Sequence, residues 1–190
     1  MWLFRFRNSL ICSSQSPRPS DMNRRIVIVG FMGSGKTTLA EALGRKLGCD
    51  VTDLDSFITE GEGRSPAEII AQAGEPEFRE VETVALRDVL ENNKAQVIAL
   101  GGGAWANEAN RALVAAHGCL SVWLDTPFEL CWERIASSET VRPLAPDRVT
   151  AEKLYHDRNE SYRLSDRRIG VSSGDSPSAL AERSWSGETS

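Results

Sequence analysis

The sequence lacks the features that define several classes of protein. Its 190 residues include only two histidines and four cysteines, and no two cysteines form a C-x-x-C pair. Zinc sites need such clusters, so we expect the cysteines to be buried free thiols in a reducing compartment. The longest apolar runs, such as residues 26–29 and 120–124, have only the length of a strand. A membrane-spanning helix needs about 20 apolar residues, so an integral membrane protein is excluded.

An excess of positive charge is also missing. The formal net charge is -5, and the split is uneven, because residues 1–25 hold five arginines and one aspartate while the remainder is strongly acidic. Nonspecific binding to nucleic acid requires Lys and Arg to neutralise phosphates. The composition therefore excludes a nucleic-acid partner, and any anionic ligand must be bound by a few local groups.

The first 23 residues differ from the rest, being rich in Arg and Ser and nearly free of acids. A transit peptide is one explanation. An upstream start codon, with Met22 as the true start, is favoured, because Met22 lies four residues before the first expected strand. We expect residues 1–23 to be a disordered extension, residues 24–183 a single domain and residues 184–190 a frayed tail. The expected location is cytoplasmic, with organellar import only if residues 1–22 are a transit peptide.

From Arg25 onward, short β-branched runs alternate with helical periodicity. This alternation predicts an α/β fold, with a doubly wound parallel five-stranded sheet and helices on both faces. The expected strands are 26–29, 51–53, 96–100, 120–124 and 168–171, and the expected helices are 36–47, 65–73, 77–91, 107–117, 126–136, 150–164 and one from 176. Residues 137–148 are polar and irregular, and we expect them to form a mobile lid.

Residues 30–37, GFMGSGKT, match the pattern G-x-x-x-x-G-K-[ST] between an expected strand and an expected helix. In this context the pattern predicts a loop whose backbone N–H groups surround phosphates. Lys36 would reach the β and γ phosphates, and the Thr37 hydroxyl would bind Mg²⁺. A nucleoside triphosphate with magnesium is the ligand that this motif implies.

The rest of the chain narrows the class of nucleotide-binding protein. The guanine-reading pattern N-K-x-D and the switch pattern D-x-x-G of GTPases are both absent. The chain is also short for an oligomeric motor ATPase. Asp125 ends an apolar run that resembles a Walker B strand, whose aspartate helps to bind Mg²⁺. Asp125 could equally be a residue at the start of the next helix. A small kinase is the interpretation that remains.

Asp53 and Asp55 are expected at the carboxyl end of the second strand, which we place beside the first. Alternation along an extended stretch would direct both carboxylates to the bound phosphates. One carboxylate, Asp53, would support Mg²⁺ through water. The other, Asp55, would accept a hydrogen bond, and later the proton, from an attacking hydroxyl.

Five segments in order resemble the shikimate kinase family. They are GSGKTT at 33–38, DLD at 53–55, EFREVE at 77–82, LGGGA at 100–104 and VRPL at 141–144. The resemblance covers residues 25–183. It implies a P-loop NTPase-like nucleoside-monophosphate-kinase architecture and ATP-dependent phosphorylation of the 3-hydroxyl of shikimate, a step of chorismate and aromatic amino acid biosynthesis. ATP and shikimate would be the ligands, Mg²⁺ the cofactor, and a monomer the functional form.

The resemblance also implies roles for particular residues. Arg79 and Arg158 match the arginines that bind the carboxylate of the acceptor, and Glu82, one helical turn after Arg79, would hold its guanidinium. Gly102 matches a position whose amide contacts the acceptor. The implied catalytic residues are Lys36, Asp55 and Arg142, and the implied ATP-binding residues are Gly33, Ser34, Gly35, Lys36, Thr37, Thr38 and Arg142, the last of which would swing over the phosphates.

The sequence departs from the family pattern at four places and leaves two alternatives open. Arg134 lies eight residues before Arg142, one more than in relatives, Ala145 replaces a leucine, residues 172–175 lack a basic side chain, and the bulky Trp105 would narrow the rim of the pocket. Gly101–Gly103 would permit close approach of a ligand or provide positive φ. One alternative is a related kinase that acts on another hydroxy acid such as gluconate. The other is a nucleotide-binding regulator without transfer activity.

Overall fold

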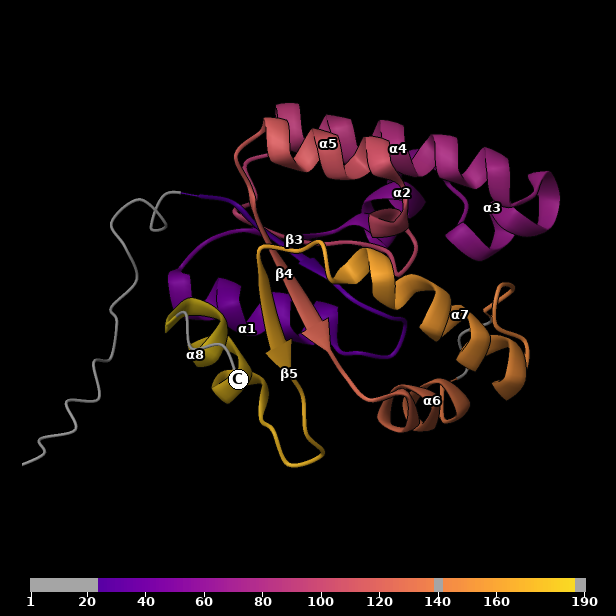
Figure 1. Cartoon of the computed structure of the whole chain (residues 1–190). Coiled ribbons are helices and arrows are strands. Elements are labelled where there is room, and N and C mark those ends of the chain that lie inside the picture. The colour runs from indigo at the N-terminus through magenta and orange to yellow at the C-terminus, as the bar shows by residue number, and fades with distance from the viewer. Residues whose placement is uncertain (1–23, 139–141, 187–190) are drawn as a thin grey trace, which may run out of the picture.

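Five parallel strands form the central sheet of the computed structural model, which describes residues 24–138 and 142–186 (Figure 1). They are β1 (Ile26–Val29), β2 (Val51–Asp53), β3 (Val97–Ala99), β4 (Leu120–Asp125) and β5 (Arg167–Gly170). The predicted α/β class and the number of strands are confirmed. The predictions for residues 1–23 and 187–190 lie outside the described residues.

The strands lie in the order β2-β3-β1-β4-β5. Our placement of the second strand beside the first is wrong, because β3 separates them: Ile28 of β1 and Asp53 of β2 both pair with Ala99 of β3. Periodicity identifies a strand but carries no information about its neighbours. Strand β1 lies between β3 on one side and β4 on the other, so the strand order reverses direction beside it. The loop after β1 therefore lies at the position where doubly wound sheets bind ligands.

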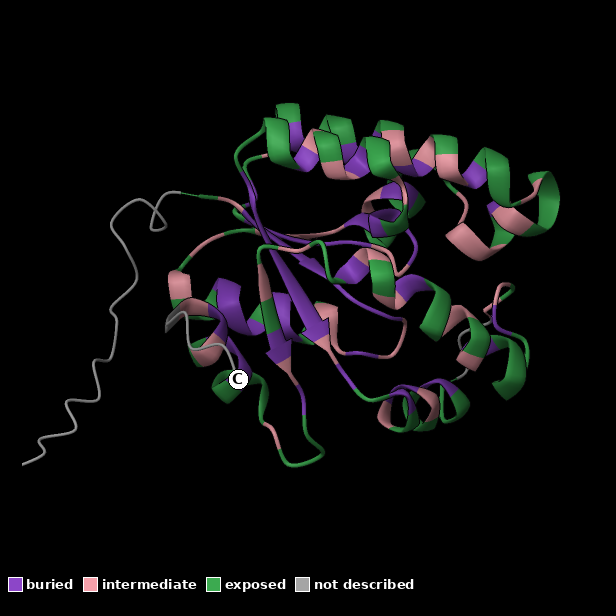
Figure 2. Cartoon of the chain, in the orientation of Figure 1, coloured by how far each residue is buried: buried purple, intermediate pink, exposed green. Residues whose placement is uncertain are grey.

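Helices cover both faces of the sheet, because successive strand residues point to opposite faces. Ile26 and Ile28 pack on one face with α1 (Lys36–Leu47) and α8 (Pro177–Ser186). Val27 and Val29 belong to the larger core on the other face. That core includes residues of α2 (Leu54–Glu62), α3 (Pro66–Ala73), α4 (Glu75–Asn92), α5 (Glu108–Ala116), α6 (Phe128–Ala136) and α7 (Arg148–Tyr162). Figure 2 shows that the strands are most fully buried at the centre of the sheet, in β1, β3 and β4, whereas the edge strands β2 and β5 are partly exposed.

Helix α2 is not among the predicted elements. Oδ1 of Asp53 accepts hydrogen bonds from the N–H groups of Asp55 at 3.1 Å and Ser56 at 3.2 Å, so Asp53 is the N-cap of this helix. Asp55 therefore lies in a helical turn, and the predicted extended stretch with alternating carboxylates is wrong. A cap of this kind satisfies backbone donors that the first turn leaves free.

The predicted start of α3 agrees with the structure, whereas the predicted end of α8 does not. The capping box of α3 is confirmed, since Ser65 accepts from the Glu68 N–H and the Glu68 carboxylate accepts from the Ser65 N–H at 2.7 Å. The predicted start of the frayed tail at residue 184 is wrong, because α8 continues to Ser186, and the rest of that tail lies outside the described residues. Ser184 is buried, and its hydroxyl donates to the Leu180 carbonyl at 2.7 Å.

The predicted lid lies between α6 and α7, and its residues 139–141 lie outside the described residues. From Arg142 the chain turns, with the Ala145 N–H donating to the Arg142 carbonyl at 2.9 Å. Ala145, which stands where the family pattern has a leucine, is still buried and packs in the larger core. Motion of this segment stays a prediction. Within the described ranges, no helix has the length and apolar character needed to span a membrane.

Candidate active site

The phosphate loop connects β1 to α1 and needs its glycines for two reasons. Gly30, Gly33 and Gly35 all have positive φ, at 148°, 74° and 100°, which costs other residues steric strain. A Cβ on Gly33 would also lie 2.6 Å from the carbonyl oxygen of Cys131 in α6. The loop is thus packed against α6, and Gly35 directly precedes the first helical residue of α1.

Lys36 is the first residue of α1, and its side chain reaches back to the loop. Its Nζ donates to the Phe31 carbonyl at 2.9 Å. Burial lowers the pKa of Lys36 to about 8, and Asp55 and Asp53 act in the opposite direction. A nearby polyphosphate would favour the charged form, so the lysine is suited to binding a nucleotide anion.

Arg134 holds the loop from the side of α6. Its Nη1 donates to the carbonyl oxygens of Gly33 and Ser34, both at 3.0 Å, and the Thr126 hydroxyl donates to the same Ser34 oxygen at 3.1 Å. In this structure the arginine with the unusual spacing therefore contacts the phosphate loop itself. The sequence identified the irregular spacing but not this contact.

Thr37 and Asp53 meet at the edge of the loop. The Thr37 hydroxyl donates to Oδ2 of Asp53 at 2.6 Å, while the other carboxylate oxygen caps α2. Magnesium binds one or two protein oxygens together with phosphates and waters. The described residues include no cluster of three or more His, Cys, Asp or Glu with metal-binding geometry, so this pair fits magnesium held through a nucleotide rather than an all-protein metal site.

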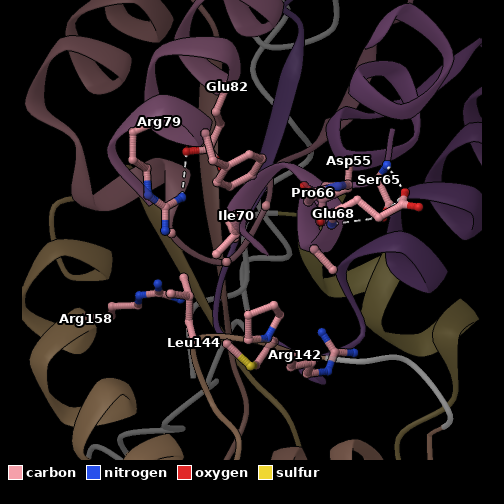
Figure 3. Close-up of a pocket in the computed structure, with 17 residues that line it drawn as sticks. Asp55, Ser65, Pro66, Glu68, Ile70, Arg79, Glu82, Arg142, Leu144 and Arg158 are labelled. Carbon is pink, nitrogen blue, oxygen red and sulfur yellow. Dashed lines mark hydrogen bonds and ion pairs between the residues drawn. The ribbon is translucent and has the colours of Figure 1, made fainter. Parts of the chain in front are cut away.

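A cavity of about 490 Å³ lies next to the phosphate loop (Figure 3). The residues that line it include Asp55 of α2, Arg79 of α4, Arg158 of α7 and Arg142 of the predicted lid. Asp55, Arg79 and Arg158 are the three side chains expected at the acceptor, and they converge although they are far apart in the sequence. Arg142, expected at the phosphates, lines the same cavity. Gly102 lines the same cavity.

Asp55 has the electrostatic environment of a candidate base. Desolvation by the surrounding protein raises its pKa, and the negative charge of Asp53 raises it further. Lys36, Arg142 and Arg79 oppose this rise. A carboxylate whose proton affinity is increased, and which reaches an open cavity, suits the role of a proton acceptor.

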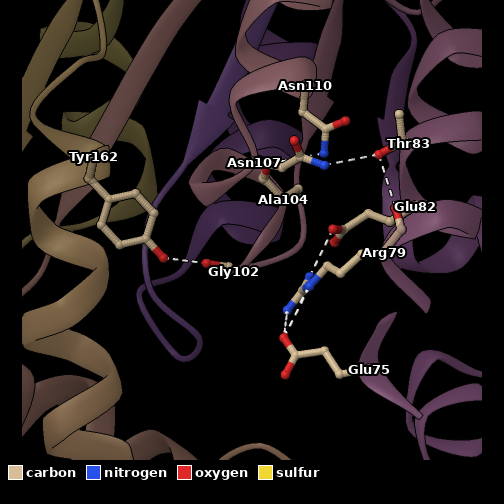
Figure 4. A network of polar contacts seen from close by, with 9 residues as sticks. All are labelled: Glu75, Arg79, Glu82, Thr83, Gly102, Ala104, Asn107, Asn110 and Tyr162. Atoms are coloured by element: carbon tan, nitrogen blue, oxygen red, sulfur yellow. Dashed lines mark hydrogen bonds and ion pairs between the residues drawn. The ribbon is translucent and has the colours of Figure 1, made fainter. Parts of the chain in front are cut away.

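Arg79 is held by two carboxylates of its own helix (Figure 4). Nη1 donates to Oε2 of Glu82 at 2.8 Å, and Nη2 donates to Oε1 of Glu75 at 2.8 Å. The predicted contact with Glu82 is confirmed, and Glu75 is an addition that its i,i+4 spacing to Arg79 signals. Glu82 is 0% exposed, and burial raises its pKa. The guanidinium is thereby fixed at the cavity wall.

Gly101, Gly102 and Gly103 each face a different group of the site. A Cβ on Gly101 would lie 2.7 Å from Oδ1 of Asp55, and one on Gly103 would lie 2.6 Å from Nη1 of Arg79. A Cβ on Gly102 would lie 3.5 Å from Nη1 of Arg158. None of the three has positive φ, so that explanation is wrong. The glycines leave room for the side chains of Asp55 and Arg79, and close approach of a ligand stays a prediction.

Comparison of the sequence with known proteins shows the family to which the chain belongs. The shikimate kinase family model matches residues 32–186. The shikimate kinase of Geobacter metallireducens is 35% identical over 175 residues, which covers 90% of this chain and 96% of the relative. The shikimate kinase of Synechococcus sp. is 37% identical over 163 residues, which covers 84% and 85%. The chain belongs to the shikimate kinase family.

Solved structures agree with this family assignment. Shikimate kinase from Acinetobacter baumannii in complex with shikimate superposes with a TM-score of 0.76 at 30% identity, covering 86% of this chain and 91% of that one. A gluconokinase from Sinorhizobium meliloti reaches a TM-score of 0.55 at 14% identity, covering 87% and 91%. The second likeness shows a shared fold alone.

Two residues singled out in the sequence lie outside the cavity, and two residues of its wall were not predicted. Trp105 is 3% exposed in the larger core and does not line the cavity, so the predicted narrowing of its rim is wrong. Asp125 accepts from Nε of Arg168 at 2.7 Å, an ion pair at the end of β4. Met32 and Phe78 form apolar walls of the cavity, and their only sequence signal is adjacency to site residues.

The predicted state, a buried free thiol, is confirmed for two of the three described cysteines, and Cys12 lies outside the described residues. Cys119 and Cys131 are buried free thiols, and Cys49 is a free thiol that is only half-buried. Burial raises the pKa of Cys131 to about 11. A thiol in that state is unreactive near neutral pH, so Cys131 serves the packing of α6 against the phosphate loop.

Proposed function

We propose that this chain catalyses the transfer of the γ-phosphoryl group of ATP to the 3-hydroxyl of shikimate, forming shikimate 3-phosphate and ADP. The observation that carries the proposal is the convergence of Arg79, Arg158 and Asp55 on one cavity beside the phosphate loop. Two arginines provide planar donors for a carboxylate. Asp55 provides an acceptor for the hydroxyl that reacts. A small hydroxylated carboxylic acid can bind the arginines through its carboxylate and Asp55 through its hydroxyl.

The acceptor would be oriented before it reacts. Arg79 and Arg158 would hold its carboxylate, and the amide of Gly102 would contact the acceptor from the glycine segment. Asp55 would accept a hydrogen bond from the 3-hydroxyl and take its proton as the new P–O bond forms. Holding the two reactants in this geometry supplies much of the rate enhancement of phosphoryl transfer.

The nucleotide would occupy the loop at residues 33–38. Backbone N–H groups of this loop, the Lys36 ammonium and the Arg142 guanidinium would stabilise the negative charge of the phosphates and of the group in transfer. The Thr37 hydroxyl, and Asp53 through water, would hold Mg²⁺. When bound, the metal would neutralise charge on the β and γ phosphates.

The remaining aspects of the function are also proposals. The active form would be a monomer, with Asp55, Arg79, Arg142 and Arg158 of one chain lining its cavity. Free rather than paired cysteines among the described residues support a reducing location such as the cytoplasm. Residues 24–183 would act as one kinase domain.

The proposal is tested by ADP release with a panel of acceptors. We expect rapid ADP formation with shikimate and Mg²⁺, little with gluconate, and little without an acceptor. Omission of Mg²⁺ is expected to abolish turnover. Preference for gluconate would favour the alternative kinase, and acceptor-independent or absent turnover would favour a nucleotide-binding regulator.

A further inference from the structure

Tyr162 is buried beneath the acceptor cavity and belongs to none of the roles described above. It lies in α7, four residues after Arg158, and its side chain is 1% exposed. The ring stacks on Trp123, with centroids 6.0 Å apart. Its hydroxyl donates a hydrogen bond to the carbonyl oxygen of Gly102 (Figure 4).

That hydrogen bond adds to a turn around the same peptide, in which the Ala104 N–H donates to the Gly101 carbonyl at 3.1 Å. Three successive glycines lack the side chains that restrict φ and ψ in other residues. Since a trans peptide is planar, its C=O and N–H groups point in opposite directions. With the Gly102 carbonyl directed at Tyr162, the N–H of Gly103 points to the opposite side. Among the described residues, no acceptor binds the N–H of Gly102 or of Gly103.

A second anchor holds the other end of the segment. Nδ2 of Asn110 in α5 donates to the Ala104 carbonyl at 3.0 Å. The two glycines between these anchors face Arg158 and Arg79, respectively. Rotation of the Gly102–Gly103 peptide would thus move the surface against which both arginines lie. The ring of Tyr162 is held in turn by its stacking on Trp123.

We propose that Tyr162 is a positioning residue for the acceptor, which acts by fixing the Gly102–Gly103 peptide and the surface that supports the two arginines. The proposal rests on the proposed function, because it concerns the same cavity. Tyr162 is not among the residues that line the cavity, so it would act through this peptide rather than on the acceptor itself. We expect its effect on acceptor binding, because among the described residues the Tyr162 hydroxyl donates to Gly102 and makes no hydrogen bond to residues 30–37. The Gly102 backbone itself lies near this loop, since a Cβ on Gly102 would lie 3.2 Å from the Met32 amide nitrogen, so the KM for ATP is the readout that separates the two sites.

Tyr162→Phe removes the hydroxyl and keeps the ring. Loss of the donor leaves the Gly102 carbonyl without this partner in a partly buried position. We expect the KM and the dissociation constant for shikimate to rise about 10-fold, while the KM for ATP stays within about twofold of wild type. Shikimate binding is measured by calorimetry in the absence of nucleotide, and the two KM values are measured by ADP release.

Tyr155→Phe is the matched control. Tyr155 lies in the same helix, and its hydroxyl also donates to a backbone carbonyl, that of Thr126 at 3.1 Å, away from the glycine segment. We expect its affinity for shikimate to equal that of wild type. The melting temperatures of both variants are measured alongside, so that a general loss of stability is visible.

The outcomes separate this inference from the proposed function. Wild-type protein without shikimate-dependent turnover would contradict the proposed function. Wild-type turnover combined with unchanged shikimate affinity in Tyr162→Phe would overturn the positioning role. Loss of ATP and shikimate affinity together, or failure of the variant to fold, would assign the hydroxyl a purely structural role and would also overturn it.

Discussion

Replacement of Asp55 by asparagine is expected to lower kcat by a factor of about 10² to 10⁴, the usual contribution of a positioned general base. Asparagine has nearly the same size, but its amide cannot take the proton of the attacking hydroxyl. The measurement is kcat with saturating shikimate and ATP, together with a melting curve. Glu60→Gln is the control, because Glu60 is an exposed carboxylate of the same helix.

The role of Asp55 as a base also predicts the direction in which activity changes with pH. Desolvation and the charge of Asp53 raise the pKa of Asp55, and only the ionised carboxylate accepts a proton. The kcat/KM of the wild type is therefore expected to fall as the pH drops through this raised pKa, above the ordinary range of an aspartate. The Asp55→Asn profile should lack this limb. Wild-type turnover in Asp55→Asn would remove Asp55 from the chemistry.

Gly103→Ala is expected to remove most of the affinity for the acceptor without unfolding the protein. The added Cβ would lie 2.6 Å from Nη1 of Arg79. The guanidinium ends a flexible side chain, so it can move and relieve the clash, but it then loses its place at the cavity wall. Loss of one partner of a desolvated charge pair costs about 2 to 5 kcal/mol, so the KM for shikimate should rise about 30-fold or more.

The experiment needs both a binding readout and a matched glycine. Binding of ATP by Gly103→Ala is expected to remain near that of wild type, because the phosphate loop is untouched. Gly61→Ala is the control, since a Cβ at Gly61 in α2 meets nothing within 4 Å. Unchanged shikimate KM in Gly103→Ala would show that the position of Arg79 is not required for acceptor binding.

The sequence predicts the nucleotide side of the site well because that information is local. A run of eight residues contains the glycines, Lys36 and Thr37, and the flanking periodicities predict the strand and the helix around them. The same applies to the capping box of Ser65 and Glu68. In each of these cases the partners are a few residues apart, so spacing alone decides the contact.

The remaining features depend on contacts between distant segments. The position of β2 next to β3, the contact of Arg134 with the phosphate loop and the hydrogen bond from Tyr162 to Gly102 join residues far apart in the chain. Hydrophobic patterning cannot specify such pairs. Trp105 shows the same limit, since its adjacency to the glycines suggested a place at the rim, whereas packing buries it in the core.

The most direct measurement compares shikimate with its methyl ester in the wild type and in Arg79→Ala, as a double-mutant cycle. If Arg79 binds the acceptor carboxylate, esterification should lower the kcat/KM of the wild type about 30-fold or more. In Arg79→Ala the same esterification should have a much smaller effect, because the partner of the carboxylate is already missing. Equal losses in both proteins would mean that Arg79 and the carboxylate act independently, which would contradict the proposed acceptor site.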